Sequence, residues 1–211
     1  MSATYGDVEV TVRDDFVATV EIRRPPDNFF DIDLVDSLVE AFDALDDDPA
    51  CRAIVLRSAG KHFCAGADFG GDPTTPITEA GGRRLYDGAI RLFEGVTPVV
   101  AAVQGAAVGG GLGLALVADF RVAAPEARFT ANFARLGFHQ GFGLSVTLPR
   151  VVGRQRALDL LYTGRRVTGE EAFRIGLADG LVPLDELAGA AHAMAAEIAR
   201  SGPLAVREIR R

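Results

Sequence analysis

The sequence has few cysteines, no tryptophan and no excess of positive charge. Only Cys51 and Cys64 occur among its 211 residues. Two cysteines in a chain of this length do not form a disulfide framework, so we expect a reducing, cytoplasmic location. Lys and Arg number 22 against 29 Asp and Glu, a formal net charge of −7. This acidic balance lacks the basic surface that a phosphate backbone requires, so we expect no nucleic-acid partner.

Neither the N-terminus nor the longest apolar run has the pattern of a membrane segment. The opening "MSATYGDVEVTVRDD" is acidic and alternates polar with apolar residues, unlike a signal peptide. Residues 98–118, "PVVAAVQGAAVGGGLGLALVA", are apolar over a length that would allow a transmembrane helix. A proline opens this run and glycines interrupt it, so a buried strand, a turn and a buried helix explain it better. We expect no membrane partner.

The chain does contain apolar residues at regular spacings, and hydrophobic residues make up 48% of it. This composition and length suit one domain with its own core. Short apolar or alternating runs predict strands over residues 8–12, 16–22, 53–58, 99–103 and 120–123. Helical spacing predicts helices over residues 34–45, 83–94, 110–118, 154–163 and 185–199. The repeated order of strand, loop and helix predicts an α/β domain with crossover connections.

Local signals mark several helix ends. Asp33 is the expected N-cap of the first helix, and "TGEE" at residues 168–171 is a capping box. Gly164 is expected to end a helix, and Pro203 to begin one. Residues 71–82 are rich in helix breakers and are predicted to form a surface loop.

Two glycine-rich loops each follow a predicted buried strand. One is "KHFCAGADFGGD", residues 61–72, and the other is "VGGGLG", residues 108–113. Ligands of α/β sheets gather beyond the carboxyl ends of strands, and small residues let a ligand approach the backbone. Two converging backbone N–H groups there would form an oxyanion hole. Close packing of helix on strand is the alternative explanation. Neither loop contains GxGxxG, so a dinucleotide fingerprint is not indicated.

Three stretches together resemble the crotonase, or enoyl-CoA hydratase/isomerase, superfamily. They are "KHFCAGADF", "VQGAAVGGGLGLALVADFRVAAPEARF" and "YTGRRVTGEEAFRIGLADGLVP", and the resemblance covers about residues 8–211. It implies an α/β fold built as a spiral of ββα units that binds acyl-CoA thioesters as a lyase or isomerase. It implies backbone oxyanion donors at Ala67 and Gly110, with Gly109 beside the substrate. Ala65 and Asp68 would border the coenzyme A adenine. No cofactor is expected, since coenzyme A is part of the substrate.

The resemblance also implies a domain plan and an assembly. Residues 1–182 would form the spiral core, and residues 183–211 the start of a C-terminal helical region. The helix that begins at Pro203 is short, so this region looks truncated. We expect Leu204, Val206 and Ile209 to present apolar surface, and large apolar patches drive association. A homotrimer or hexamer is therefore expected.

Two positions depart from the hydratases of this family, which use a pair of glutamates. The corresponding residues are Gly113, two residues after the "GGG" of residues 109–111, and Phe133 in "ARFTANF". Neither side chain can move a proton, so ordinary two-glutamate hydration is not expected. Isomerisation, hydration by another base, or a related C–C or C–X step remain open. The alternative is a pseudoenzyme that binds acyl-CoA without turnover.

Several residues are candidates for the missing acid or base. The first of them is His139, in "LGFHQGFG", because histidine side chains as a class can act as acid or base, with a structural role as its alternative. Asp68 is expected to be a helix cap rather than a base. His62 is expected to be structural or close to coenzyme A, and His192 to face solvent. Asp72, Glu79, Tyr86 and Asp87 lie on or after the predicted loop and stay open.

The remaining candidates concern the acyl pocket and bound metal. Phe133, Phe138 and Phe142 are expected to line an apolar acyl pocket, with ordinary core packing as the alternative. Cys64 is expected to be a small buried thiol, because nothing near it in sequence would lower its pKa. No group of His, Cys and carboxylates has metal-ligand spacing, so no metal is expected.

Overall fold

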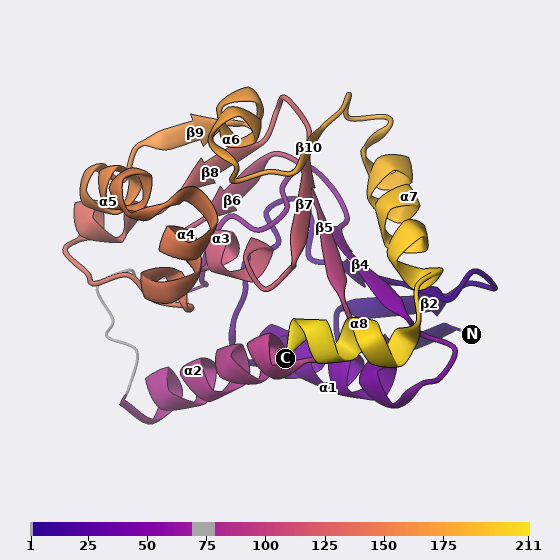
Figure 1. The fold of residues 1–211 in the computed structure, drawn as a ribbon. Helices are drawn as coiled ribbons and strands as arrows, with labels where there is room; N and C mark the ends of the chain where they lie inside the picture. Colours follow the sequence, from indigo (N-terminus) through magenta and orange to yellow (C-terminus); the bar gives the residue numbers. More distant parts are fainter. Residues whose placement is uncertain (1, 69–78) are drawn as a thin grey trace.

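The computed structural model describes residues 2–68 and 79–211, which form an α/β fold around a seven-stranded sheet (Figure 1). The strands run in the order β1-β2-β3-β4-β5-β7-β10. From β3 to β10 the neighbours are parallel, whereas β1, β2 and β3 pair antiparallel. Their bounds are β1 Ser2–Tyr5, β2 Val8–Val12, β3 Val17–Ile22, β4 Ala53–Ser58, β5 Val99–Val103, β7 Phe120–Ala123 and β10 Gly180–Leu181.

A second, three-stranded sheet lies beyond the carboxyl ends of the parallel strands. It has the order β6-β8-β9 and consists of β6 Ala106–Val108, β8 Arg128–Thr130 and β9 Arg166–Thr168. These strands are only three residues long and carry no clear alternation, so the sequence did not predict them. The short helices beside this sheet are α3 Gly110–Ala115, η1 Asn132–Leu136, α4 Leu144–Val152, α5 Arg154–Thr163 and α6 Gly169–Ile175.

Helices cover both faces of the large sheet, which gives the molecule two apolar cores. Figure 1 shows α1 Ile32–Asp47 and α2 Glu79–Glu94 side by side below the sheet, and α7 Leu187–Ala199 along its other face. Leu34, Leu38 and Phe42 of α1 belong to the main core. Four residues of α7 form a separate cluster with the opposite face of the strands, namely Leu187, Ala191, Ala195 and Ala199. The amphipathic spacing of these helices therefore matches what they bury.

Most of the local signals in the sequence are confirmed. Thr168 accepts a hydrogen bond from the Glu171 N–H, Gly164 ends α5 in the left-handed conformation, and Pro203 opens α8 Pro203–Arg210. The cap of α1 was placed wrongly, because Asp31 and not Asp33 accepts from the Leu34 N–H, at 2.8 Å. Asp33 lies in the first turn of that helix, where a carboxylate is also favoured.

Three further boundaries differ from the prediction. Residues 79–82 are helical and belong to α2, so the predicted loop ends earlier; residues 71–78, including Asp72, lie outside the described residues. The apolar helix at residue 110 ends at Ala115 rather than at residue 118. No helix within residues 2–68 and 79–211 is both long and apolar enough to cross a membrane.

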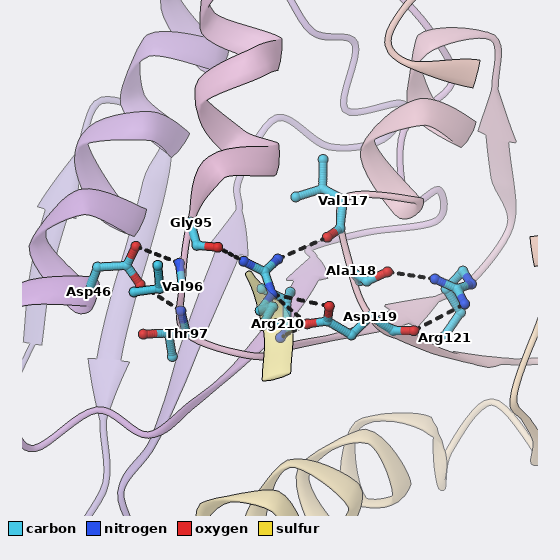
Figure 2. Close-up of polar contacts among 10 residues, drawn as sticks. Asp46, Gly95, Val96, Thr97, Val117, Ala118, Asp119, Arg121 and Arg210 are labelled. Carbon is cyan, nitrogen blue, oxygen red and sulfur yellow. Dashed lines mark hydrogen bonds and ion pairs between the residues drawn. The ribbon is translucent and has the colours of Figure 1, made fainter. Parts of the chain in front are cut away.

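Two arginines bond the loops at the strand ends, one from β7 and one from the C-terminal helix (Figure 2). The Arg121 side chain, 3% exposed, donates to the carbonyl oxygens of Leu177 and Ala118 at 2.8 and 2.6 Å. Burial lowers the pKa of its guanidinium, and the nearby Asp179 opposes that shift. Arg210 of α8 donates to Asp119 at 2.8 Å and also to the carbonyl oxygens of Gly95 and Val117. The last helix is thereby tied to the loops that precede β5 and β7.

Replacing Arg121 tests how much this network stabilises the fold. We expect Arg121→Met to lower the free energy of unfolding by about 3 kcal/mol, because several buried acceptors would lose their donor. Urea unfolding followed by circular dichroism measures the change. Arg200→Met is the control, since Arg200 and Glu197 form an ion pair with side chains 74% and 73% exposed. An equal effect of both substitutions would contradict the interpretation.

Candidate functional site

The two glycine-rich loops meet at the junction of the large and the small sheet. Residues 61–68 run between the Asp27–Phe30 segment on one side and β6 on the other. The Cys64 N–H donates to Ala106 at 2.9 Å, and the Cys64 carbonyl accepts from Val108 at 3.0 Å. On the opposite side, Phe30 donates to the Gly66 carbonyl at 3.0 Å and accepts from the Asp68 N–H at 2.8 Å. The 61–68 loop therefore forms a β-bridge with the chain on each of its two sides.

Within residues 2–68 and 79–211, this bridge leaves the Ala67 N–H without a hydrogen-bond acceptor. Ala67 pairs with Phe30 in parallel register, and in such a pair the bonds are made by the residues on either side of it. The Gly110 N–H is also unpaired within the described residues, because Gly110 is the first residue of α3 and has no intrahelical acceptor. The two expected donors are thus both available backbone N–H groups on neighbouring loops.

The glycines of the second loop explain why the loops can lie so close. A Cβ on Gly111 would stand 2.2 Å from the Cys64 carbonyl oxygen, and one on Gly110 would stand 2.3 Å from the Phe30 ring. Gly109 has a φ of +57° and a ψ of −116°, a conformation open only to glycine. Close packing was the alternative explanation for these glycines, and it is correct for Gly111. The same close packing brings the Ala67 loop and the Gly110 loop together.

Phe142 occupies the space beside Gly113. A Cβ at residue 113 would stand 2.6 Å from the Phe142 Cβ and 2.7 Å from its carbonyl oxygen. Phe142 is 6% exposed, has a φ of +50°, and packs edge-to-face on Phe30 with ring centroids 5.4 Å apart. It packs in the same way on Phe93, at 6.4 Å. Phe142 is therefore core packing, and it occupies the space into which a side chain at 113 would project.

Of the other two phenylalanines, Phe133 is near the glycine loop and Phe138 is not enclosed. Phe133 is partly buried, and its Cζ lies 3.6 Å from the position of a Cβ on Gly109. Its Cε1 lies 3.8 Å from the equivalent position on Gly141. Phe138 is 52% exposed. The structure thus brings Phe133 and Phe142 to the glycine loop of residues 108–113, and places Phe138 at the surface.

The histidines have separate environments. His139 is exposed, and its Nδ1 lies 2.9 Å from the carbonyl oxygen of Gln140. The Nδ1 of His62 accepts from the Ala106 N–H at 2.9 Å, which supports the structural role expected for it. His192 was expected to face solvent, which is wrong: its Nε2 lies 2.7 Å from Asp15 Oδ2, and its Nδ1 is buried without a partner in the described part of the chain.

The remaining predicted residues fall into three groups. Cys64 is fully buried, and burial raises the pKa of its thiol to about 12, so it is the inert thiol expected. The Ala65 N–H donates to the Asp27 carbonyl at 2.9 Å, which fixes the loop near Asp68. Asp87 is exposed on α2, and so is Tyr86, at 51%. No cluster of possible metal ligands occurs within residues 2–68 and 79–211.

Two residues of the site were not singled out from the sequence. Asn28 is fully buried; its Nδ2 donates to the Ala59 and His62 carbonyls at 2.7 and 2.6 Å, so it anchors the start of the 61–68 loop. Its place after "PPD" is a turn signal that could have drawn attention to it. Asn132 lies beside Gly109, with its Oδ1 3.2 Å from the position of a Cβ there. Nothing in the local sequence indicates that proximity.

Comparisons with known proteins show which family this chain is similar to. The family model described as Enoyl-CoA hydratase/isomerase matches residues 13–211. The relative named "Probable enoyl-CoA hydratase EchA14", of Mycobacterium tuberculosis, is 40% identical over 201 residues, covering 92% of this chain and 76% of the relative. "Crotonyl-CoA hydratase" of Syntrophomonas wolfei is 37% identical over 203 residues, again with 92% and 76% covered.

Solved structures show the same similarity in three dimensions. An enoyl-CoA hydratase subunit I from Geobacillus kaustophilus superposes with a TM-score of 0.90 at 31% identity, covering 99% of this chain and 81% of that one. DspI of Pseudomonas aeruginosa gives 0.91 at 32% identity, covering 99% and 80%. Because the family model spans nearly the whole chain and the relatives exceed 30% identity over most of it, this chain belongs to the enoyl-CoA hydratase/isomerase family of the crotonase superfamily.

Proposed function

We propose that the chain binds an acyl-CoA thioester and stabilises its enolate with the Ala67 and Gly110 N–H groups. The observation that carries this proposal is a pair of backbone donors, on two loops held in contact, that have no acceptor among the described residues. Membership of the enoyl-CoA hydratase/isomerase family supports the choice of an acyl-CoA as substrate. The coenzyme A adenine would lie along Ala65 and Asp68. Coenzyme A belongs to the substrate, and no separate cofactor is proposed.

The chemistry of the two donors follows from the charge that develops on the thioester. When a base removes a proton from the carbon next to the carbonyl, the electron pair is delocalised onto the carbonyl oxygen. Two fixed N–H groups that point at this oxygen stabilise the enolate more than the neutral thioester. Removal of one such donor in a hydrolase costs about 3 to 4 kcal/mol of transition-state stabilisation. The rigid bridge of Ala67 to Phe30 would hold one donor in place.

The reaction proposed is not hydration by a pair of glutamates. Gly113 and Phe133 carry no titratable group, and Phe142 fills the space beside Gly113. Water addition needs a base for the water and an acid for the carbon. An isomerisation, or a C–C or C–X step through the same enolate, requires no such pair. A non-catalytic acyl-CoA-binding protein is the second candidate, favoured by the lack of a titratable group at both positions.

We also propose a homotrimer or hexamer as the working assembly. Leu204 and Ile209 of α8 are 79% and 84% exposed, whereas Arg207 and Arg210 on the same helix point inward to Thr97 and Asp119. The helix is thus fixed by its cations and presents large apolar side chains outward. Such a surface supports association with other copies of the chain.

Replacing the Ala67 amide with an ester tests the oxyanion proposal. Lactic acid in place of Ala67 removes one N–H and keeps the shape of the backbone. We expect the wild type to exchange the α-protons of butyryl-CoA for deuterium in D2O, and the ester to slow this exchange about 100-fold. The same change at Ala205 of α8 is the control. NMR follows the exchange, and calorimetry measures binding. Measurable exchange at the same rate in all three proteins would overturn the proposal. Binding of butyryl-CoA with no exchange in the wild type would establish the non-catalytic candidate.

A second substitution tests whether the space at Gly113 is closed. We expect Gly113→Ala to reduce the free energy of unfolding by about 1 to 3 kcal/mol, since its Cβ would overlap Phe142. Gly189→Ala is the control, because Gly189 is a helical glycine with no atom within 4 Å of the added Cβ. The control should be neutral or stabilising. Chemical denaturation distinguishes them, and equal stability of both variants would show that residue 113 has room for a side chain.

The assembly is tested by light scattering at micromolar concentration. We expect the mass of a trimer or a multiple of it, and we expect Leu204→Lys with Ile209→Lys to shift the mass toward the monomer. Glu208→Lys is the matched control on the same helix. A wild-type monomer would contradict the proposed assembly.

A further inference from the structure

The ring of His62 joins the two loops that carry the proposed donors. His62 lies at the start of the 61–68 loop, and its Nδ1 accepts a hydrogen bond from the Ala106 N–H at 2.9 Å. Ala106 is the first residue of β6, which leads directly into the loop of Gly110. One side chain therefore connects the segment that contains the Ala67 N–H with the segment that contains the Gly110 N–H.

This hydrogen bond stands in for one that the two backbones do not make. Cys64 pairs with Ala107 in parallel register, and the Cys64 N–H donates to the Ala106 carbonyl at 2.9 Å. Continuing that pattern by one step would pair the Ala106 N–H with the His62 carbonyl oxygen. The His62 carbonyl instead accepts from Asn28 Nδ2 at 2.6 Å. The His62 ring takes the Ala106 N–H, so a side chain supplies the bond that the backbone does not.

Gly105 makes room for the ring. Its φ of +53° turns the chain between β5 and β6, and a Cβ there would stand 2.5 Å from the His62 Nδ1. The same Cβ would stand 2.2 Å from the Lys61 carbonyl oxygen. Glycine therefore lets the loop and β6 lie this close together. The His62 side chain is 22% exposed and is held against β6 rather than in solvent.

The other ring nitrogen, Nε2, faces the Asp27–Phe30 segment. Because Nδ1 accepts a hydrogen bond, the ring proton is carried by Nε2, which lies 3.6 Å from Asp27 Oδ1. The Asp27 carbonyl accepts from the Ala65 N–H at 2.9 Å, and the same segment pairs with Ala67. The ring is thus placed where this segment, the 61–68 loop and β6 meet.

We infer that His62 is a positioning residue for the proposed reaction, because its ring fixes the separation of the Ala67 and Gly110 N–H groups. The inference rests on the proposed function. Donors to a developing oxyanion act through geometry that is set before the reaction, and a displacement of about 1 Å can slow a reaction about 100-fold. Loss of the Nδ1 acceptor would remove one of the bonds between the loops. The rate with bound substrate should then fall more than the affinity, since the enolate depends on the donors more than the thioester does.

Two substitutions of His62 separate its acceptor from the rest of its ring. Asn presents an oxygen at about the place of Nδ1, whereas Leu is apolar and has no acceptor. We expect His62→Leu to slow the α-proton exchange of saturating butyryl-CoA about tenfold, since the Cys64 backbone bonds remain and limit the displacement. The half-saturating concentration should change less than about twofold. His62→Asn should restore the rate to within about threefold of the wild type.

His192→Leu is the matched control. The His192 side chain is 21% exposed, close to the value for His62, and its Nε2 lies 2.7 Å from Asp15 Oδ2. Its helix α7 packs on the other face of the large sheet and contributes to neither glycine-rich loop. We expect this variant to keep the wild-type exchange rate at a temperature where circular dichroism shows every variant folded.

A variant that leaves His62 intact tests the same bond from its other end. Lactic acid in place of Ala106 replaces the N–H that Nδ1 accepts by an ester oxygen. We expect the same fall in exchange rate, about tenfold. This ester keeps the test valid if His62→Leu fails to fold.

The outcomes separate this inference from the function on which it rests. Wild-type exchange rates in both His62→Leu and the Ala106 ester would overturn the positioning role while the oxyanion proposal stands. Equal losses in His62→Leu and His62→Asn, or in His62→Leu and His192→Leu, would overturn it as well. No exchange in the wild type would overturn the oxyanion proposal and the inference with it.

Discussion

The close approach of Gly111 to the Cys64 carbonyl is the contact on which the site depends. With only 2.2 Å available for a Cβ there, residue 111 must be glycine for the loop after β4 and the loop after β5 to touch. That contact brings the Ala67 bridge beside the start of α3, and the segments it joins supply the two N–H groups that have no acceptor in the described part of the chain. The large sheet and the α7 cluster supply the rigid base from which the two loops extend.

How far the sequence predicts this protein depends on the range of the interaction. Strands such as Ala53–Ser58 and caps such as Thr168 follow from patterns within a few residues, and they were found. The glycine-rich loops indicated that a ligand can approach the backbone there. The resemblance to the crotonase superfamily then implied Ala67 and Gly110 as the N–H donors. The sequence could not show that Phe142 fills the space at Gly113 or that His192 meets Asp15, because those partners are 29 and 177 residues apart. Such pairs are set by tertiary packing.

In the C-terminal helix α8, the charged and the apolar side chains point in different directions. Its arginines enter the protein and satisfy carbonyl oxygens and Asp119, while its leucine and isoleucine face outward. An ordinary amphipathic helix does the reverse. Inward-pointing arginines of this kind fix the orientation of the helix, because each carbonyl oxygen accepts a hydrogen bond only from a suitably placed donor. The helix is therefore oriented by hydrogen bonds and leaves its apolar face open to another surface.

The pairing of Gly113 with Phe142 also bears on how this chain can change by mutation. An acidic side chain at residue 113 would overlap both the Cβ and the carbonyl oxygen of Phe142, so truncating the ring alone does not make room for it. The backbone of residues 141–143 has to move first, and that segment is packed against Phe93 and Tyr86 of α2. A lineage that carries this pair therefore needs more than one substitution to place a carboxylate at residue 113.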